Sequence, residues 1–153
     1  MTMQDTVGVD IDLRKYYAWS TSRGVLCNQA TTVLQLLGSL ATSRPSTILL
    51  EVAGPVIYGK EKAALYNKMR WTIHNVFVAS MVGNAAASCK NLTVLVSPSS
   101  RWKHGHDDKS LHRMLGLTGM NKHLREAQAM ATMYQTTKHQ ADWVDWYGYF
   151  FGV

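Results

Sequence analysis

The chain has 153 residues, 46% of them hydrophobic, and a net charge of +6. This length favours one domain over residues 1–153 with its own hydrophobic core, and the composition excludes general disorder. No apolar run reaches the roughly 18 residues of a membrane-spanning helix, and the N-terminal residues lack the zones of a secretory signal. The two isolated cysteines, Cys27 and Cys89, favour a reducing compartment and therefore a cytoplasmic protein.

The first half of the chain contains four strand-like segments and one helical segment. Residues 6–12, 15–20 and 24–28 are short and rich in β-branched or aromatic residues, and they predict an antiparallel meander. Apolar residues then recur at helical spacing over residues 29–41, and a proline ends that helix. Residues 47–52 form an apolar run with one carboxylate, which is typical of a buried central strand.

The second half contains mostly helical patterns around one further strand. An apolar stripe predicts a long helix over residues 58–88, and residues 92–96 predict another buried strand. The polar segment that follows is expected to be a loop with a short helix over residues 107–115. Helical spacing then predicts two last helices, over residues 120–135 and 139–151.

This order of elements predicts the fold class. A meander followed by alternating strands and helices implies a mixed sheet with helices on its faces. It is the order of the RNase H-like fold, so the sequence predicts an α/β protein with a mixed five-stranded sheet flanked by helices. Such a fold does not by itself assign a function.

Four carboxylates occur where an ordinary core would reject them. Asp10 follows an apolar run in the first strand, and Glu51 follows another in the central strand. Asp142 and Asp145 lie among aromatic residues, and their spacing of three puts them on one face of the predicted last helix. Buried carboxylates are costly and repel one another, whereas a divalent cation with oxygen ligands removes both penalties. We therefore expect these four residues to share a Mg²⁺ or Mn²⁺ site.

Three of these carboxylates also have an ordinary structural explanation, and Asp145 among tryptophans is the hardest to explain in that way. Asp10 could end its strand as a solvated turn residue, and Asp12 on the same strand face is an alternative ligand. Glu51 could pair with a lysine such as Lys60, and Asp142 could be favoured by a helix dipole. The four together, in this element order, are more specific than any one alone.

Three segments around these carboxylates carry a family resemblance. VGVDID, ILLEVAGP and HQADWVDW resemble the acidic motifs of the RuvC family of Holliday-junction resolvases, and also those of the DEDD transposases of insertion sequences. The resemblance implies that Asp10, Glu51, Asp142 and Asp145 are catalytic and bind two Mg²⁺ ions that cut DNA. Two ions about 3.5–4 Å apart can activate a water and stabilise the leaving oxygen of a phosphodiester.

The resemblance also implies residues that contact DNA. The family has a lysine about twenty residues before the first aspartate of the last motif, and Lys122 has that separation from Asp142. Lys122 is therefore the first candidate for an active-site lysine, and Lys109 is the second. Either could instead be a solvated surface lysine. The further residues expected to contact the DNA backbone are Arg101, Trp102 and Lys103.

The sequence departs from the family in two places. An aromatic residue often follows the glutamate of the central strand, whereas Tyr58 is the nearest candidate here to stack on an exposed base. Tyr58 could equally pack within the long helix. The loop after residue 101 is longer than usual, and its histidines, His104 and His106, could take part in acid–base chemistry, ligate a metal or be solvated.

Charge and resemblance together lead to one functional hypothesis. Between Arg101 and His139 there are seven Lys or Arg and only three Asp or Glu, a bias that can neutralise phosphates. The hypothesis is a Mg²⁺-dependent endonuclease that resolves four-way DNA junctions in the cytoplasm of a bacterial or phage-infected cell. Cutting two symmetric strands requires two sites, so we expect a homodimer, with the 58–88 helix as a contact surface. The alternatives are a less selective nuclease of this fold and an inactive nucleic-acid-binding module.

Overall fold

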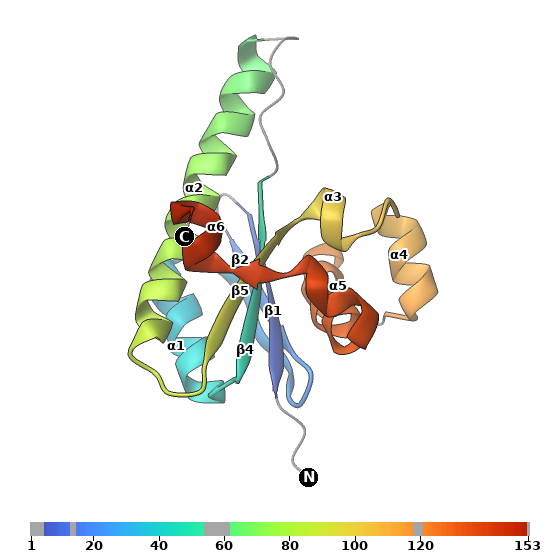
Figure 1. Cartoon of the computed structure of the whole chain (residues 1–153). Helices are drawn as coiled ribbons and strands as arrows, with labels where there is room; N and C mark the ends of the chain where they lie inside the picture. The colour runs from blue at the N-terminus through green and yellow to red at the C-terminus, as the bar shows by residue number, and fades with distance from the viewer. Residues whose placement is uncertain (1–4, 13–14, 54–61, 118–120, 153) are drawn as a thin grey trace.

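The computed structural model of the chain describes residues 5–12, 15–53, 62–117 and 121–152. These residues form one mixed sheet with helices on both of its faces (Figure 1). The strands are β1 (Thr6–Ile11), β2 (Tyr16–Ser20), β3 (Gly24–Ala30), β4 (Thr47–Val52), β5 (Thr93–Pro98) and β6 (Val144–Asp145). The helices are α1 (Val33–Ser43), α2 (Lys62–Ala87), α3 (Ser99–Trp102), α4 (Asp108–Leu115), α5 (Lys122–Gln135), the 3₁₀ helix η1 (Thr137–Asp142) and α6 (Trp146–Phe151).

The sheet has the order β3-β2-β1-β4-β5-β6. The first three strands form the antiparallel meander that the sequence predicted, and β1, β4 and β5 run parallel to one another. The predicted α/β fold with a mixed sheet is therefore confirmed. The strand count differs, because β6 pairs antiparallel with β5 and adds a sixth strand to the expected five.

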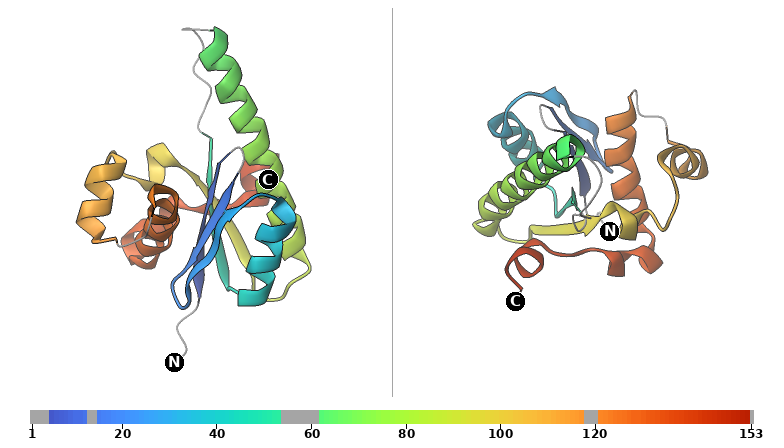
Figure 2. Two further views of the ribbon diagram at one scale, coloured as in Figure 1. Left: turned by 180° about the vertical axis from the view of Figure 1, so that it is seen from behind. Right: turned by 90° about the horizontal axis from the view of Figure 1, so that it is seen from above.

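Each face of the sheet is covered by different helices (Figure 2). Alternate residues of the central strands, among them Val9 and Leu50, pack with α1 and α2 in one apolar core. The other residues face α5, where Leu49 packs against Met130. Gly8 allows α5 to approach β1 closely, because a Cβ atom at that position would lie 2.0 Å from the carbonyl oxygen of Ala127.

Capping side chains at the N-termini of α1 and α5 fix the residues at which these helices begin. The hydroxyl of Thr32 accepts a hydrogen bond from the backbone N–H of Gln35, and Oε1 of Gln35 accepts one from the backbone N–H of Thr32; this capping box starts α1. Asn121 caps α5 in a similar way through the backbone N–H of Leu124. Among the described helices, none is long and apolar enough to cross a membrane.

The last predicted helix, over residues 139–151, is wrong in its first half. Residues 137–142 form a 3₁₀ helix, Val144 and Asp145 pair with β5, and only Trp146–Phe151 form an α-helix. Trp143 packs in the core beside Trp102, and the chain must be extended there to bring Val144 to the free edge of β5. Asp142 and Asp145 therefore do not share a helical face.

Candidate metal centre

Asp10 and Glu51 lie side by side at the ends of two parallel strands. Val9 pairs with Leu50 across β1 and β4, so the next residue of each strand, Asp10 and Glu51, stands at the same level of the sheet. Both side chains are on the face that α5 covers, because they follow Gly8 and Leu49 by two residues. The meeting of these two carboxylates follows from the parallel register.

A histidine of α5 holds the carboxylate of Asp10. Nδ1 of His123 lies 2.8 Å from Oδ2 of Asp10, and the imidazole stacks on the ring of Tyr17 with 4.6 Å between centroids. The hydrogen bond with Asp10 raises the pKa of His123. The capped start of α5 thus positions His123, which orients the Oδ2 atom of Asp10.

Glu51 is a largely buried carboxylate in a fixed position. Nε1 of Trp102 donates to its Oε1 at 3.0 Å, and Nδ2 of Asn75 donates to its backbone oxygen at 2.7 Å. Burial raises the pKa of Glu51 to about 7, the negative charges of Asp10 and Glu126 add to the rise, and the ammonium of Lys103 opposes it. This carboxylate is therefore ready to accept positive charge, as a proton or as a cation.

Lys103 lies at the centre of a group of carboxylates that we call the Lys103 cluster: Lys103, Glu51, Asp108 and Glu126. Its Nζ lies 2.6 Å from Oδ1 of Asp108, 2.9 Å from Oε2 of Glu126 and 3.9 Å from Oε1 of Glu51. Burial alone would lower the pKa of Lys103, but these three carboxylates outweigh it and raise the pKa. Nε2 of His112 lies 3.0 Å from Oε1 of Glu126, which is only 5% exposed.

Glu126 is a residue that the sequence analysis missed. Burial raises the pKa of Glu126, and its charge acts on Glu51. A signal was present, because Glu126 is an acidic residue in the otherwise small and apolar stretch EAQAMA of a predicted helix. Its partner on the loop after β5 could not be inferred from that stretch.

The carboxylates of Asp10 and Glu51 fit a divalent cation bound through oxygen. Among the described residues, Oδ1 of Asp10 and Oε2 of Glu51 make no hydrogen bond or ion pair, so each is left as an oxygen ligand. Oxygen donors of this kind suit Mg²⁺ and Mn²⁺. A cation there would also remove the cost of the buried charge on Glu51, for which Lys103 at 3.9 Å compensates only in part.

Asp142 lies in a different setting, beside two histidines and an arginine. Its Oδ2 lies 2.5 Å from Nε2 of His104 and 3.9 Å from Nδ1 of His139. Its Oδ1 lies 3.9 Å from Nε of Arg101. Trp143 follows Asp142 directly and contacts Trp102, which holds Glu51, so this group and Glu51 are connected by two packed rings.

Asp145 serves as a helix cap. Its Oδ2 accepts hydrogen bonds from the backbone N–H groups of Tyr147 at 3.1 Å and Gly148 at 3.4 Å, which starts α6. It pairs with Leu95 of β5, two residues before the level of Glu51 along the sheet. Within the described residues, no hydrogen bond or ion pair links Asp145 to Asp10, Glu51 or Asp142.

The residues expected to contact DNA differ in accessibility. The side chain of Lys122 is 65% exposed, with Nζ 3.7 Å from Oδ2 of Asp108, and that of Arg101 is 57% exposed. Lys109 is exposed on α4. Trp102 is 1% exposed and Lys103 is held in its cluster, so neither side chain is available to a DNA backbone. Tyr58 and Lys60 lie outside the described residues.

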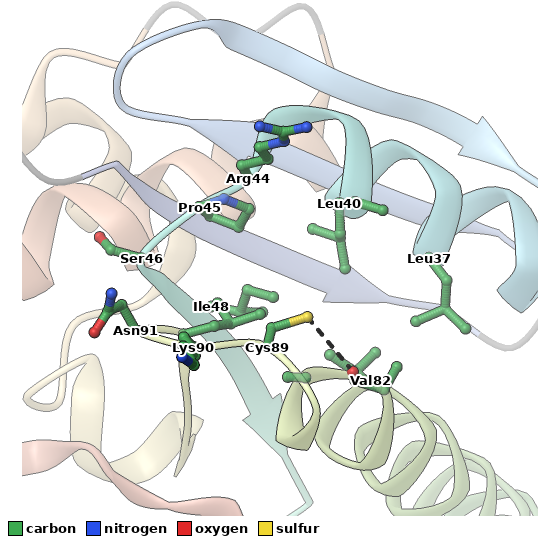
Figure 3. Close-up of a pocket in the computed structure, with 14 residues that line it drawn as sticks. Leu37, Leu40, Arg44, Pro45, Ser46, Ile48, Val82, Cys89, Lys90 and Asn91 are labelled. Atoms are coloured by element: carbon green, nitrogen blue, oxygen red, sulfur yellow. Dashed lines mark hydrogen bonds between the residues drawn. The ribbon is translucent and has the colours of Figure 1, made fainter.

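An apolar cavity lies apart from the carboxylates of Asp10 and Glu51. It has a volume of about 620 Å³ and lies between α1 and α2, where Leu40, Ile48 and Val82 line it (Figure 3). Ile48 is near the start of β4, whereas Glu51 is near its end. The carboxylates therefore lie at the other end of the strand from the cavity.

Comparison with known proteins finds similarity in structure alone. No protein-family model matches the chain, and no curated protein matches its sequence. Two structures of Thermus thermophilus RuvC, one of them in complex with a Holliday junction substrate, match with TM-scores of 0.56 and 0.54 at 15% identity. These matches cover 92% and 94% of this chain and 99% of each RuvC chain.

The yeast mitochondrial Holliday junction resolvase Ydc2 also matches, with a TM-score of 0.47 and 15% identity over 90% of this chain and 79% of that chain. The two RuvC matches extend over almost the whole of each RuvC chain and over most of this chain. The chain has the RNase H-like fold of RuvC.

Proposed function

We propose that this protein is a metal-dependent endonuclease that resolves four-way DNA junctions as a homodimer. The observation that carries the proposal is the position of Asp10 beside Glu51, at the ends of adjacent parallel strands of a RuvC-like sheet. A carboxylate pair on this scaffold has the donor atoms for Mg²⁺ or Mn²⁺. The RuvC structure in complex with a Holliday junction substrate has the same fold, and this supports branched DNA as the substrate.

Four carboxylates have proposed catalytic and metal-binding roles. Asp10 and Glu51 are the central ligands, and Asp142 and Asp145 are the further ligands from the C-terminal segment. When bound, divalent ions supply an activated water and stabilise the leaving oxygen of the phosphodiester. Trp102 and His123 orient the ligands through their hydrogen bonds to Glu51 and Asp10. Asp145 must leave its cap on α6, or bind through its other oxygen, to join them.

Exposed cations near the carboxylates support binding to a phosphate backbone. Lys122 is the proposed active-site lysine, with Lys109 as the second candidate, and Arg101 lies beside Asp142. Each lysine or arginine that neutralises a phosphate releases counterions, so binding should weaken steeply as salt increases. Tyr58, in the segment between β4 and α2, keeps its proposed role of stacking on an exposed base.

An apolar stripe on α2 supports the homodimer. Tyr66, Met69, Ile73 and Phe77 recur at intervals of three and four residues, and each is 46–66% exposed. A monomer would leave this stripe in water, whereas two copies related by a twofold axis would bury it in an isologous interface. Such a dimer would present two sites, as paired cleavage of a symmetric junction requires.

The test is cleavage of a synthetic four-way junction beside its linear duplex arms, with Mg²⁺, by the wild type and by Asp10→Asn and Glu51→Gln. Paired symmetric nicks on the junction, lost in both variants, are the expected result. Equal cleavage of junction and duplex would show that the protein is a less selective nuclease and not a junction resolvase. Binding of junctions without cleavage in Mg²⁺ or Mn²⁺ would overturn the proposal in favour of an inactive binding module.

A further inference from the structure

Three metal-ligating side chains converge on one point outside the Asp10–Glu51 pair. Nε2 of His104, Nδ1 of His139 and Oδ2 of Asp142 all lie within 4.8 Å of one another. The separations are 2.5 Å for His104 to Asp142, 2.9 Å for His104 to His139 and 3.9 Å for His139 to Asp142. Ligand atoms at about 2.1 Å from one tetrahedral zinc ion are roughly 3.4 Å apart, so shifts of less than about 1 Å would seat an ion.

A single proton on His104 explains both of its contacts only if the two neighbouring groups share that proton. A ring nitrogen carries either one hydrogen or one lone pair. Nε2 of His104 lies within hydrogen-bond distance of both the carboxylate oxygen of Asp142 and Nδ1 of His139. If it donates its hydrogen to the carboxylate alone, it has nothing left to offer the second imidazole. A cation between the three atoms would use one lone pair from each.

The backbone aims His104 into this group. His104 has a φ of 51° and Gly105 a φ of 78°, so the loop after α3 turns through the left-handed region. His139 and Asp142 are three residues apart on the 3₁₀ helix η1, which places them on the same side. Two segments far apart in sequence therefore supply the donors.

The group is open enough for an ion and its water. The side chains of His104, His139 and Asp142 are 39%, 18% and 17% exposed. Arg101 is the nearby cation, 3.9 Å from Oδ1 of Asp142, and its side chain is 57% exposed. It can turn into solvent without disturbing the core.

We propose that His104, His139 and Asp142 form a binding site for a divalent transition metal, with Zn²⁺ as the preferred ion. Two imidazoles and one carboxylate with an open position match the donor sets of such metals, whereas Mg²⁺ prefers oxygen ligands. The inference deepens the proposed nuclease function, on which it rests for its role in catalysis, because Asp142 is one of the four proposed catalytic carboxylates. The site differs from the Asp10–Glu51 pair by its nitrogen ligands.

The test is metal binding by the full chain, measured by Zn²⁺ calorimetry and by the visible absorption of bound Co²⁺. His104→Asn and His139→Asn are each compared with the wild type and with the matched control His106→Asn, a change in the same loop. We expect tight Zn²⁺ binding and tetrahedral Co²⁺ bands in the wild type and control. Each ligand variant should bind Zn²⁺ more weakly by at least about 100-fold, since even outer-shell changes cost roughly 10–100-fold.

Two outcomes would overturn the site: a wild type that binds neither ion, or ligand variants that bind as the wild type does. Circular dichroism of each variant checks that a variant with weaker metal binding is still folded. Asp10→Asn separates this inference from the proposed function. It should keep the Co²⁺ bands while losing junction cleavage, and a variant that keeps both would contradict only the proposed function.

Discussion

Glu51 illustrates how a single residue can be costly for stability and useful for function. It is held by Trp102 and Asn75 in a largely buried place, near Asp10 and Glu126. Burial and these like charges raise the pKa of Glu51 from 4.5 to about 7. The folded state therefore binds this proton more tightly than the unfolded chain does. The contribution of Glu51 to the free energy of unfolding should therefore fall as pH rises from about 4.5 to about 7 and level off above that range.

Glu51→Gln should stabilise the metal-free protein at pH 8. The neutral amide removes a buried charge, and the shift in pKa corresponds to a gain of at most about 3 kcal/mol. Urea unfolding in EDTA measures this gain, and at pH 4, where Glu51 is protonated in both states, the two proteins should unfold alike. Added Mg²⁺ should raise the stability of the wild type more than that of the variant. A less stable variant at pH 8 would contradict this account of Glu51.

Lys103 provides the opposite case, a buried cation that stabilises carboxylates. Lys103→Met would leave Glu126 and Glu51 buried without it, and removing one partner of a buried ion pair costs about 3–5 kcal/mol. Lys122→Met is the matched control, because that side chain is 65% exposed and an exposed pair contributes about 0–1 kcal/mol. Urea unfolding at pH 8 measures the free energy of unfolding of both variants. Equal losses of stability would show that Lys103 does not stabilise the fold.

At the scale of elements, the packing of α5 on β1 positions Asp10 against His123. Gly8 makes this packing possible, since any side chain there would meet the backbone of α5 at Ala127. A backbone contact is more costly to relieve than a contact with the end of a flexible side chain. The approach of this helix to this strand is therefore a condition for the candidate metal centre.

Gly8→Ala should destabilise the protein by about 3 kcal/mol or more. Overpacking of a core usually costs about 1–3 kcal/mol, and here the added Cβ would clash with the backbone of α5, which cannot shift without the rest of the helix. Gly38→Ala is the matched control. No atom lies within 4 Å of its added Cβ, and an alanine inside α1 should stabilise by about 0.5–1 kcal/mol. Thermal unfolding measures both. A Gly8 variant as stable as the wild type would mean that α5 can shift from β1.

At the scale of the whole molecule, α2 extends beyond the sheet (Figure 1). It carries the exposed apolar stripe of Tyr66, Met69, Ile73 and Phe77. Ile73→Glu places a charge in the stripe and should convert the proposed homodimer to a monomer, as charges are excluded from the cores of such interfaces. Leu34→Glu, at an exposed apolar residue of α1, should leave the dimer intact. Sedimentation velocity distinguishes the two. A monomeric wild type would remove the dimer from the proposal.

Local sequence patterns predicted the order of the strands and helices through residue 135, apart from the short helix α3. Apolar runs and apolar periodicity are local signals, and they predicted the meander, the two buried strands after it and most of the helices around them. The parallel strands also made it foreseeable that Asp10 and Glu51 would meet, since both carboxylates follow apolar runs that end at one edge of the sheet. Their metal-binding role stays a prediction.

The conformation after residue 136 and the partners of the charged groups depend on contacts between segments that are distant in sequence. The sequence analysis expected residues 143–145 to be helical. The free edge of β5 offers backbone hydrogen bonds and Trp102 offers a packing partner, so the chain is extended there. Lys103 and Glu126, and likewise His104 and His139, meet from segments far apart in sequence. Local patterns cannot encode such meetings, because they depend on which surfaces the folded sheet and helices bring together.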